Sequence, residues 1–280
     1  MIVSEIISEI RHKRWEDKSA SWGLVPTMGS LHEGHLSLVR QAREENNRVA
    51  ASIFVNPIQF NRKNDYDSYP TNLASDLELL EREGVDLVWT PQKSLVYPEI
   101  FQTYIDVTQL SKVLEGAARP GHFQGVTTIV AILFNVFQPT RAYFGQKDAQ
   151  QEAVIRRMVE DLHFNIEIRS CPTVREKDGL AMSSRNANLT KKARAAAPVL
   201  FRALNLAKVA IEKGEISSKN IYQLLKNEIE KSECAQIDYI SIADQKTLNE
   251  IKIIAGNVLI SLAVFWDEVR LIDNIRISNK

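Results

Sequence analysis

Strand-like apolar runs alternate with helical patterns through about the first 170 residues of the chain. Strands are expected at residues 23–27, 48–55, 85–89, 141–144 and 165–169, and helices at 34–46, 71–83 and 149–162, after a first helix that carries Ile6, Ile7 and Ile10. The apolar run 126–138 fits either a buried helix or a long strand, because its periodicity does not decide between them. Since parallel strands need a crossover between them, the alternation predicts an α/β fold, a Rossmann-like parallel sheet with helices on both faces.

The pattern changes after about Arg185. Two long helical stretches, 190–213 and 217–233, are followed by strand-like runs at 236–242, 257–266 and 268–272. Two helices followed by strands predict a smaller C-terminal α+β domain. Pro172 and Gly179 mark a loop before the change, so we expect a first domain over residues 1–173 and a second over 174–280.

The balance of charge excludes several classes of partner. The 280 residues include 35 basic and 35 acidic side chains, so no overall field attracts nucleic acid or a membrane surface, although a local basic pocket stays open. The longest apolar run, 126–137, is too short to cross a bilayer. Cys171 and Cys234 lie far apart, as expected of free thiols in a reducing compartment, and the opening stretch contains Glu5 and Glu9, unlike a secretory signal. We therefore expect a cytoplasmic protein.

The stretch VPTMGSLHEGH, residues 25–35, has the form of a strand, a glycine-containing turn and the start of a helix. Ligands of open α/β sheets bind at the carboxyl ends of the strands, and a helix N-terminus there favours phosphate. Gly29 and Gly34 allow the backbone to approach a ligand, and His32 and His35 lie one helical turn apart. We expect both imidazoles to face phosphates and to stabilise the charge that builds when a nucleophile attacks an α-phosphate.

Other interpretations of the two histidines are less favoured. A zinc helix has its histidines four residues apart in HExxH, whereas HEGH spaces them by three and no third ligand is evident nearby. The dinucleotide fingerprint GxGxxG and the Walker loop are absent. A pair of surface or core histidines without function stays open.

Two further strand ends contain polar groups that suit a small acid and a nucleotide. Asn56 and Gln59 in FVNPIQF offer amides that both donate and accept, although Asn56 before a proline also suits a plain turn. In FGQKDAQQ, Gly145 permits close approach and Lys147 supplies a positive charge for phosphate. Asp148 fits either a ribose hydroxyl or a simple helix cap.

Two loops add candidates. AMSSRN, residues 181–186, joins two hydroxyl groups to a guanidinium, which suits a triphosphate, although such loops are common on surfaces. EGAARPGHFQGV, residues 115–126, is a glycine-rich stretch whose segment Arg119–Gly125 is either a flap over the site or an ordinary loop.

These motifs together resemble the pantothenate synthetase (pantoate–β-alanine ligase) family. LVPTMGSLHEGH, SIFVNPIQF, EGAARPGHFQGV, YFGQKDAQQ and KDGLAMSSRN occur in the family's order and spacing, and RLIDNI at 270–275 extends the resemblance over nearly the whole chain. The motif HxGH alone is shared with a wider nucleotidyltransferase superfamily, but the five stretches together are specific.

The resemblance implies an ATP-dependent ligase without a protein nucleophile. In the family, the carboxylate of pantoate attacks the α-phosphate of ATP, which gives pantoyl adenylate and pyrophosphate. The amine of β-alanine then attacks the activated carbonyl and releases pantothenate and AMP. The resemblance also implies Mg²⁺ with the ATP, although no carboxylate cage is visible in the sequence, and a homodimer.

The family's residue roles carry over to matching positions. His35 would be the principal catalytic residue, with His32 and Lys147 beside it at the phosphates. Gln59 and Gln151 would bind pantoate, Gln59 would also lie near β-alanine, and Asn56 would support that pocket. The ATP site would comprise Met28, Gly29, Ser30, Leu31, His32, Glu33, Gly34, His35, Gly145, Gln146, Lys147, Asp148, Val174, Met182, Ser183, Ser184 and Arg185.

Two other classes of function stay open. A nucleotidyltransferase that retains the nucleotide on its product would share HxGH, but would not need the amides of Asn56, Gln59 and Gln151. A non-catalytic nucleotide-binding protein on the same fold would not need to keep His32, His35 and Lys147.

Overall fold

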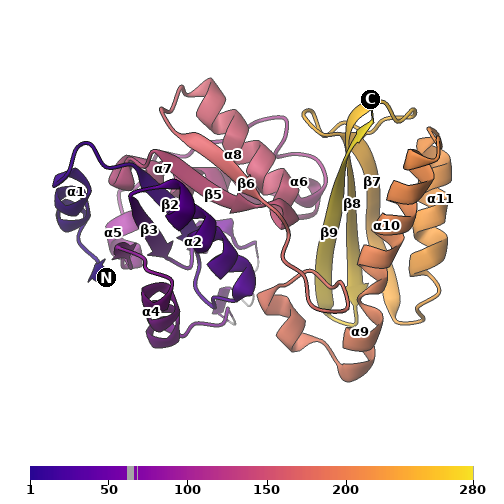
Figure 1. The fold of residues 1–280 in the computed structure, drawn as a ribbon, viewed down its shortest axis with the longest axis horizontal. Helices are drawn as coiled ribbons and strands as arrows, with labels where there is room; N and C mark the ends of the chain where they lie inside the picture. The colour runs from indigo at the N-terminus through magenta and orange to yellow at the C-terminus, as the bar shows by residue number, and fades with distance from the viewer. Residues whose placement is uncertain (62–65, 68, 280) are drawn as a thin grey trace. The chain divides into compact units, whose positions relative to one another are not determined.

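A computed structural model describes residues 1–61, 66–67 and 69–279. The chain forms two compact units, shown in Figure 1. One comprises Met1–Gln146 and Gln150–Pro172, and the other comprises Lys147–Ala149 and Thr173–Lys280. The short segment Lys147–Ala149 therefore groups with the second unit, although the chain on either side of it belongs to the first. No helix among the described residues is long and apolar enough to span a membrane.

The first unit is built on a six-stranded sheet in the order β1-β4-β3-β2-β5-β6, and every pair is parallel. The strands are β1 (Ile2–Ser4), β2 (Trp22–Thr27), β3 (Arg48–Ile53), β4 (Leu87–Trp89), β5 (Arg141–Gly145) and β6 (Glu167–Cys171). The connecting elements are α1 (Ile7–Trp15), α2 (Glu33–Glu45), η1 (Pro57–Gln59), α4 (Leu73–Arg82), α5 (Lys93–Val96), α6 (Glu115–Ala118), α7 (His122–Phe137) and α8 (Ala149–Asp161). The predicted parallel sheet is confirmed.

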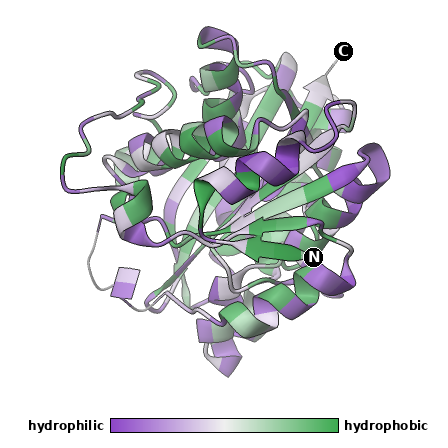
Figure 2. Cartoon of the chain, turned by 90° about the vertical axis from the view of Figure 1, so that its left-hand side faces the viewer, coloured by the Kyte–Doolittle hydropathy of each residue, from purple (hydrophilic) through white to green (hydrophobic). Residues whose placement is uncertain are grey.

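Helices cover both faces of this sheet. On one face Val25, Val49 and Val88 pack with buried residues of α2 and α4 such as Val39 and Leu80. Neighbouring strand positions point the other way, and there Trp89 meets Phe137 at the end of α7, with ring centroids 6.3 Å apart. Figure 2 shows the apolar colouring of these strands, which are covered from both sides.

The ambiguous run 126–138 is a helix in the structure. Its residues 126–137 lie within α7, Gln138 is the C-cap, and nearly every residue of that helix is buried. A helix that is apolar all round has no period for a sequence pattern to reveal.

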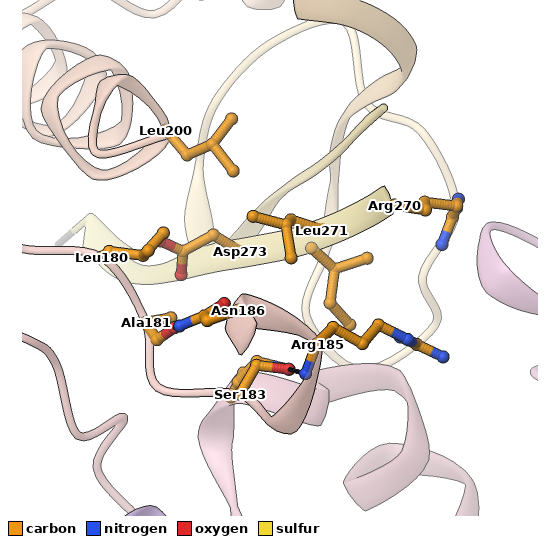
Figure 3. A pocket seen from close by; sticks show the side chains of 11 residues that line it. Leu180, Ala181, Ser183, Arg185, Asn186, Leu200, Arg270, Leu271 and Asp273 are labelled. Atoms are coloured by element: carbon orange, nitrogen blue, oxygen red, sulfur yellow. Dashed lines mark hydrogen bonds between the residues drawn. The ribbon is translucent and has the colours of Figure 1, made fainter. Parts of the chain in front are cut away.

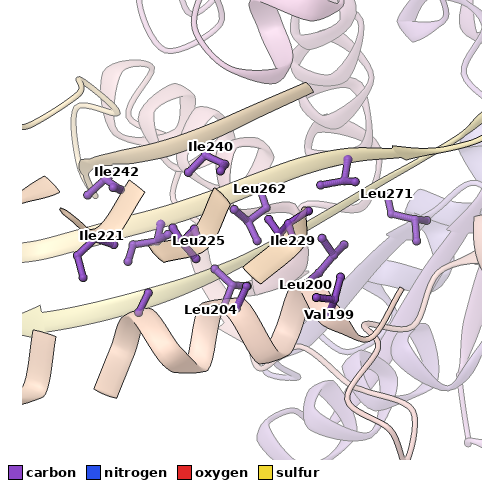
Figure 4. Packing of buried hydrophobic residues seen from close by; sticks show 14 of the residues in the cluster. Val199, Leu200, Leu204, Ile221, Leu225, Ile229, Ile240, Ile242, Leu262 and Leu271 are labelled. Carbon is purple, nitrogen blue, oxygen red and sulfur yellow. The ribbon is translucent and has the colours of Figure 1, made fainter. Parts of the chain in front are cut away.

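The second unit packs two long helices against an antiparallel sheet. Its strands pair in the order β7 (Ala235–Asp244), β8 (Gly256–Trp266) and β9 (Val269–Asn279). Its helices are α9 (Lys191–Ala196), α10 (Val199–Glu212) and α11 (Ser218–Ile229). It also contains the short turn η3 (Ser184–Asn188) and most of η2 (Gln146–Asp148), whose first residue, Gln146, belongs to the first unit. Figure 4 shows Leu204, Leu225 and Ile229 of the helices meeting Leu262 and Ile240 of the sheet. The predicted α+β character of this part is confirmed.

Two expectations about elements were wrong, and one strand was missed. The single helix predicted over 190–213 is two, α9 and α10, because Pro198 has no N–H to continue the first and would clash with the preceding turn. The last strand runs to Asn279 instead of stopping at residue 272, since its pairing with β8 continues from Trp266↔Val269 to Gly256↔Asn279. The strand β1 was not predicted, because its three residues are too few to show a period.

Candidate active site

The turn between β2 and α2 has an unusual backbone. Gly29 and Ser30 both have positive φ angles, of 84° and 52°. The Gly29 N–H donates to Thr27 Oγ1 over 3.2 Å. A Cβ atom at Gly29 would lie 2.9 Å from Asp76 Oδ2, so glycine is required here by both conformation and space.

Asp76 holds this turn in place, a role that was not predicted from the sequence. Its carboxylate accepts the N–H groups of Ser30 over 2.9 Å and Leu31 over 2.8 Å, and the residue is 3% exposed. Asp76 belongs to α4 and lies four residues before the fully buried Leu80. A carboxylate on the buried stripe of a helix is the signal that could have revealed it.

The two predicted histidines are brought together at the start of α2. His32 is the N-cap residue and its Nδ1 accepts the Gly34 N–H over 3.1 Å, while His35 Nδ1 accepts the His32 N–H over 3.3 Å. Their ring centroids are 4.1 Å apart. Each Nδ1 accepts a main-chain N–H, so a neutral ring has its proton on Nε2. The Nε2–H group of each ring is then a hydrogen-bond donor. Two imidazole donors therefore stand beside a helix N-terminus, which itself favours anions.

Glu33, the residue between them, is engaged elsewhere. Its carboxylate accepts the guanidinium of Arg40, which also donates to Glu83. The hydrogen bond from Arg40 holds the pKa of Glu33 below its ordinary value. Of the residues predicted in this turn, Glu33 therefore presents an ion-paired side chain, and only its backbone N–H belongs to the helix N-terminus.

The amides predicted at the end of β3 form a chain whose orientation is determined. Asn56 Nδ2 donates to the Gly125 carbonyl and to Gln59 Oε1, both over 3.0 Å, and Asn56 Oδ1 accepts the Tyr97 hydroxyl over 2.8 Å. A backbone carbonyl only accepts hydrogen bonds, so the Asn56 atom that contacts the Gly125 carbonyl is the amide nitrogen. The same nitrogen donates to Gln59, so the Gln59 atom that it contacts is the amide oxygen. The amide nitrogen of Gln59 is then the group directed to Met28, whose Sδ lies 2.8 Å away.

The segment Arg119–Gly125 lies against this amide chain. His122 Nδ1 is 2.8 Å from the carbonyl oxygen of Gln59, and Asn61 donates to the Pro120 carbonyl. A Cβ atom at Gly125 would lie 2.7 Å from the Gln59 backbone nitrogen, so glycine is needed for this close approach. The part of this segment from His122 to Gly125 is not a loop but the first turn of α7, and it is bonded to the turn that carries Gln59.

Other predicted residues belong to the ends of β5 and α8. Gly145 ends β5 and Gln151 lies in the first turn of α8, half-buried. Gln146 starts η2 and belongs with the first unit.

The remaining predicted residues lie in the second unit, where a pocket joins several of them. Figure 3 shows the side chains that line it, among them Ser183 and Arg185 at the start of η3 and Leu271 and Asp273 of β9. Lys147 also lines this pocket, its side chain 18% exposed, and its Nζ lies 3.8 Å from Asp148 Oδ1. The full lining is Lys147, Leu180, Ala181, Ser183, Arg185, Asn186, Leu200, Arg270, Leu271, Ile272 and Asp273.

Val174 and Met182 bracket the loop before η3. The Met182 N–H donates to the Val174 carbonyl over 3.0 Å. Ser183 accepts the Arg185 N–H on its hydroxyl over 3.3 Å, which caps the turn that Ser184 begins. Among the described residues, no three histidine, cysteine or carboxylate side chains gather as metal ligands would.

The sequence model of one family, described as pantoate-beta-alanine ligase, matches residues 2–276. The chain belongs to the pantoate–β-alanine ligase family. It is therefore an enzyme that joins pantoate to β-alanine in the synthesis of pantothenate.

Known members of the family agree with this along the whole chain. The pantothenate synthetase of Clostridium botulinum (strain Langeland) is 51% identical over 262 residues, which cover 94% of this chain and 93% of that protein. The crystal structure of pantothenate synthetase from Thermus thermophilus superposes with a TM-score of 0.93 at 44% identity, covering 98% of this chain and 99% of that one. A pantoate–β-alanine ligase from Francisella tularensis, crystallised with "Beta-gamma ATP" and β-alanine, has a TM-score of 0.79 at 34% identity and covers 98% of this chain and 97% of that one.

Proposed function

We propose that this ligase works through a pantoyl-adenylate intermediate and uses ATP as the activating substrate. The observation that carries the proposal is the pair of imidazoles at the start of α2, whose Nδ1 atoms each accept a main-chain N–H and which lie beside the N–H groups of a helix N-terminus. The Francisella relative, solved with an ATP compound and β-alanine, supports the same substrates here.

The reaction needs two displacements. A carboxylate oxygen of pantoate attacks the α-phosphorus of ATP, and the bond to pyrophosphate breaks. The amine nitrogen of β-alanine then attacks the acyl carbon, AMP leaves with the anhydride oxygen, and the nitrogen loses a proton. Positioning and stabilisation of phosphate charge are the catalytic contributions required. His35 is the principal catalytic residue of this proposal, and His32 is its neighbour at the phosphates.

The remaining ATP contacts come from four segments. The turn from Met28 to His35 provides backbone N–H groups, and Gly145 with Gln146 allows close approach of the main chain. Lys147 would contact the phosphates together with Ser183, Ser184 and Arg185, and Asp148 would bind a ribose hydroxyl. Val174 and Met182 would complete the nucleotide site.

For the acid substrate, Gln59 and Gln151 are the proposed contacts. Gln59 would donate its amide hydrogens to an oxygen of pantoate, since its own oxygen is already held by Asn56. Asn56 acts by orienting Gln59, because its amide nitrogen and oxygen both have protein partners.

Three further properties belong to the same proposal. ATP would enter as its Mg²⁺ complex, in which the cation offsets phosphate charge. The enzyme would work in the cytoplasm, which suits the two free cysteines, Cys171 and Cys234. It would act as a homodimer, which sedimentation velocity would test.

Isotope exchange tests the proposed reaction. Incubation with Mg-ATP and labelled pyrophosphate should return label to ATP only when pantoate is present, and added β-alanine should then yield AMP and pantothenate. A nucleotidyltransferase that retains its nucleotide would release no AMP on addition of β-alanine. Absence of pantoate-dependent exchange would remove the adenylate pathway.

A further inference from the structure

Two adjacent residues of β9, Asp273 and Asn274, are bonded to two different segments of the proposed ATP site. The Asp273 carboxylate accepts Arg175 Nη1 over 2.6 Å and Nη2 over 2.9 Å. Asn274 Nδ2 donates to the main-chain carbonyl of Lys147 over 2.8 Å. Both residues are buried, at 2% and 8% exposure. They belong to the motif RLIDNI, for which the reaction above gives no role.

The Asp273 contact fixes the loop that leads to Ser183. Arg175 also donates to the Gly179 carbonyl over 3.1 Å, and its guanidinium lies 3.9 Å from the centroid of the Phe201 ring. Residues 176–180 of this loop turn back on themselves, and the Glu176 N–H donates to the Leu180 carbonyl over 2.8 Å. The base of this loop is therefore attached to β9 through a bidentate ion pair, a geometry that restrains orientation as well as distance.

The Asn274 contact fixes the other segment. Lys147 starts the three-residue piece that groups with the second unit, while Gln146 and Gln150 belong to the first. The Asn274 amide is bonded to the main chain of Lys147, so it acts on the point from which the ammonium side chain extends. Lys147 and Ser183 line the same pocket.

We propose that Asn274 is a positioning residue that holds Lys147 in register with the Ser183–Arg185 turn. The inference rests on the proposed function, in which both segments contact the phosphates of ATP. Neighbouring positions on one rigid strand set the spacing of the two segments, so the ammonium and the hydroxyl groups meet the polyphosphate as one fixed set. Such preorganisation matters because a displacement of about 1 Å can cost about 100-fold in rate.

Single substitutions test the contact. Asn274→Ala should lower kcat/KM for ATP in pyrophosphate exchange by about three- to tenfold, the scale of one hydrogen bond, and should leave the KM for pantoate within about twofold. Asn274→Asp keeps the shape but has no N–H, so it should lose at least as much. The matched control is Asn257→Ala, at an exposed asparagine of β8 in the same sheet, which should stay within about twofold of the parent.

A double-mutant cycle separates positioning from general stability. If Asn274 acts through Lys147, then Asn274→Ala should change single-turnover adenylation by less than about twofold in a Lys147→Ala background. Losses that multiply, or wild-type ATP kinetics in Asn274→Ala, would overturn the proposal. Should the alanine variant not fold, Asn274→Ser, which is too short to reach the Lys147 carbonyl, gives the same readout.

The outcome is distinguishable from failure of the proposed function. If the parent enzyme lacks pantoate-dependent exchange, the adenylate pathway fails and the cycle has no meaning. If the parent exchanges label and the cycle is multiplicative, the adenylate pathway stands and only the role of Asn274 is rejected.

Discussion

Asp76→Asn is the substitution that most directly tests how the histidine turn is held. The native carboxylate accepts two main-chain N–H groups, from Ser30 and Leu31, at a buried position. The two N–H groups lie on different oxygens of the carboxylate, so an asparagine in the same orientation keeps an acceptor for one of them and turns its amide nitrogen toward the other. One buried donor is then left without an acceptor.

The magnitude follows from these two bonds. A buried unsatisfied donor costs about 1–3 kcal/mol, and replacing the charged acceptor in the remaining bond costs about 1 kcal/mol more. The sum, about 2–4 kcal/mol, is the most by which the native turn can be disfavoured, and it corresponds to a factor of about 30–700 in its population. Below that ceiling, we expect adenylate formation to slow by about tenfold, because His32 and His35 follow this turn directly.

The assay is single-turnover formation of pantoyl adenylate at saturating ATP and pantoate. Glu78→Gln is the matched control, since it makes the same chemical change on the exposed side of α4, where Glu78 pairs only with Arg82 among the contacts resolved. That control should stay within about twofold. If Asp76→Asn folds normally and forms adenylate at the parental rate, the turn does not depend on its carboxylate and our reasoning is wrong.

Three other perturbations give independent tests. Gln59→Glu should raise the KM for pantoate by about tenfold or more while sparing ATP, because it replaces a donor by an anion facing the anionic substrate; equal losses for both substrates would mean that Gln59 does not contact pantoate. Gly125→Ala should destabilise the enzyme by about 1–3 kcal/mol in urea unfolding, since its Cβ would lie 2.7 Å from the Gln59 backbone nitrogen; unchanged stability would show that the turn carrying Gln59 moves aside easily. Burial raises the pKa of the Cys171 thiol to about 11, so at pH 8 roughly 0.1% is thiolate, and iodoacetamide labelling of the native enzyme should be slow there and rise with pH up to that pKa; rapid labelling at pH 8, read by mass spectrometry, would contradict this.

The sequence was sufficient for the parallel sheet because its evidence is local and repeated. Five of the six strands are short apolar runs that alternate with helical patterns, as in Arg48–Ile53 after α2. Where the pattern lacked a period, as in α7, or where one residue interrupted it, as at Pro198, the local evidence was insufficient or misleading.

Parts of the candidate site were predictable for a different reason. His32 and His35 lie in one short motif, so their proximity follows from helical spacing alone. Asp76 lies 46 residues after Ser30, and its contact depends on how α4 packs against the sheet. The orientation of Gln59 depends on a carbonyl 66 positions further along the chain, at Gly125, through Asn56. Long-range hydrogen bonds of this kind leave little trace in a single sequence.

The assignment of Lys147–Ala149 to the second unit has a consequence for dividing the protein. A fragment ending at Pro172 would contain Lys147 but not Asn274, and a complementary fragment starting at Thr173 would contain the reverse. Neither piece alone could form the hydrogen bond between the Asn274 amide and the Lys147 main-chain carbonyl. A mixture of the two fragments should therefore bind the phosphates of ATP through Lys147 only if residues 147–149 of the first fragment associate with the second fragment. Split-protein complementation would report that association.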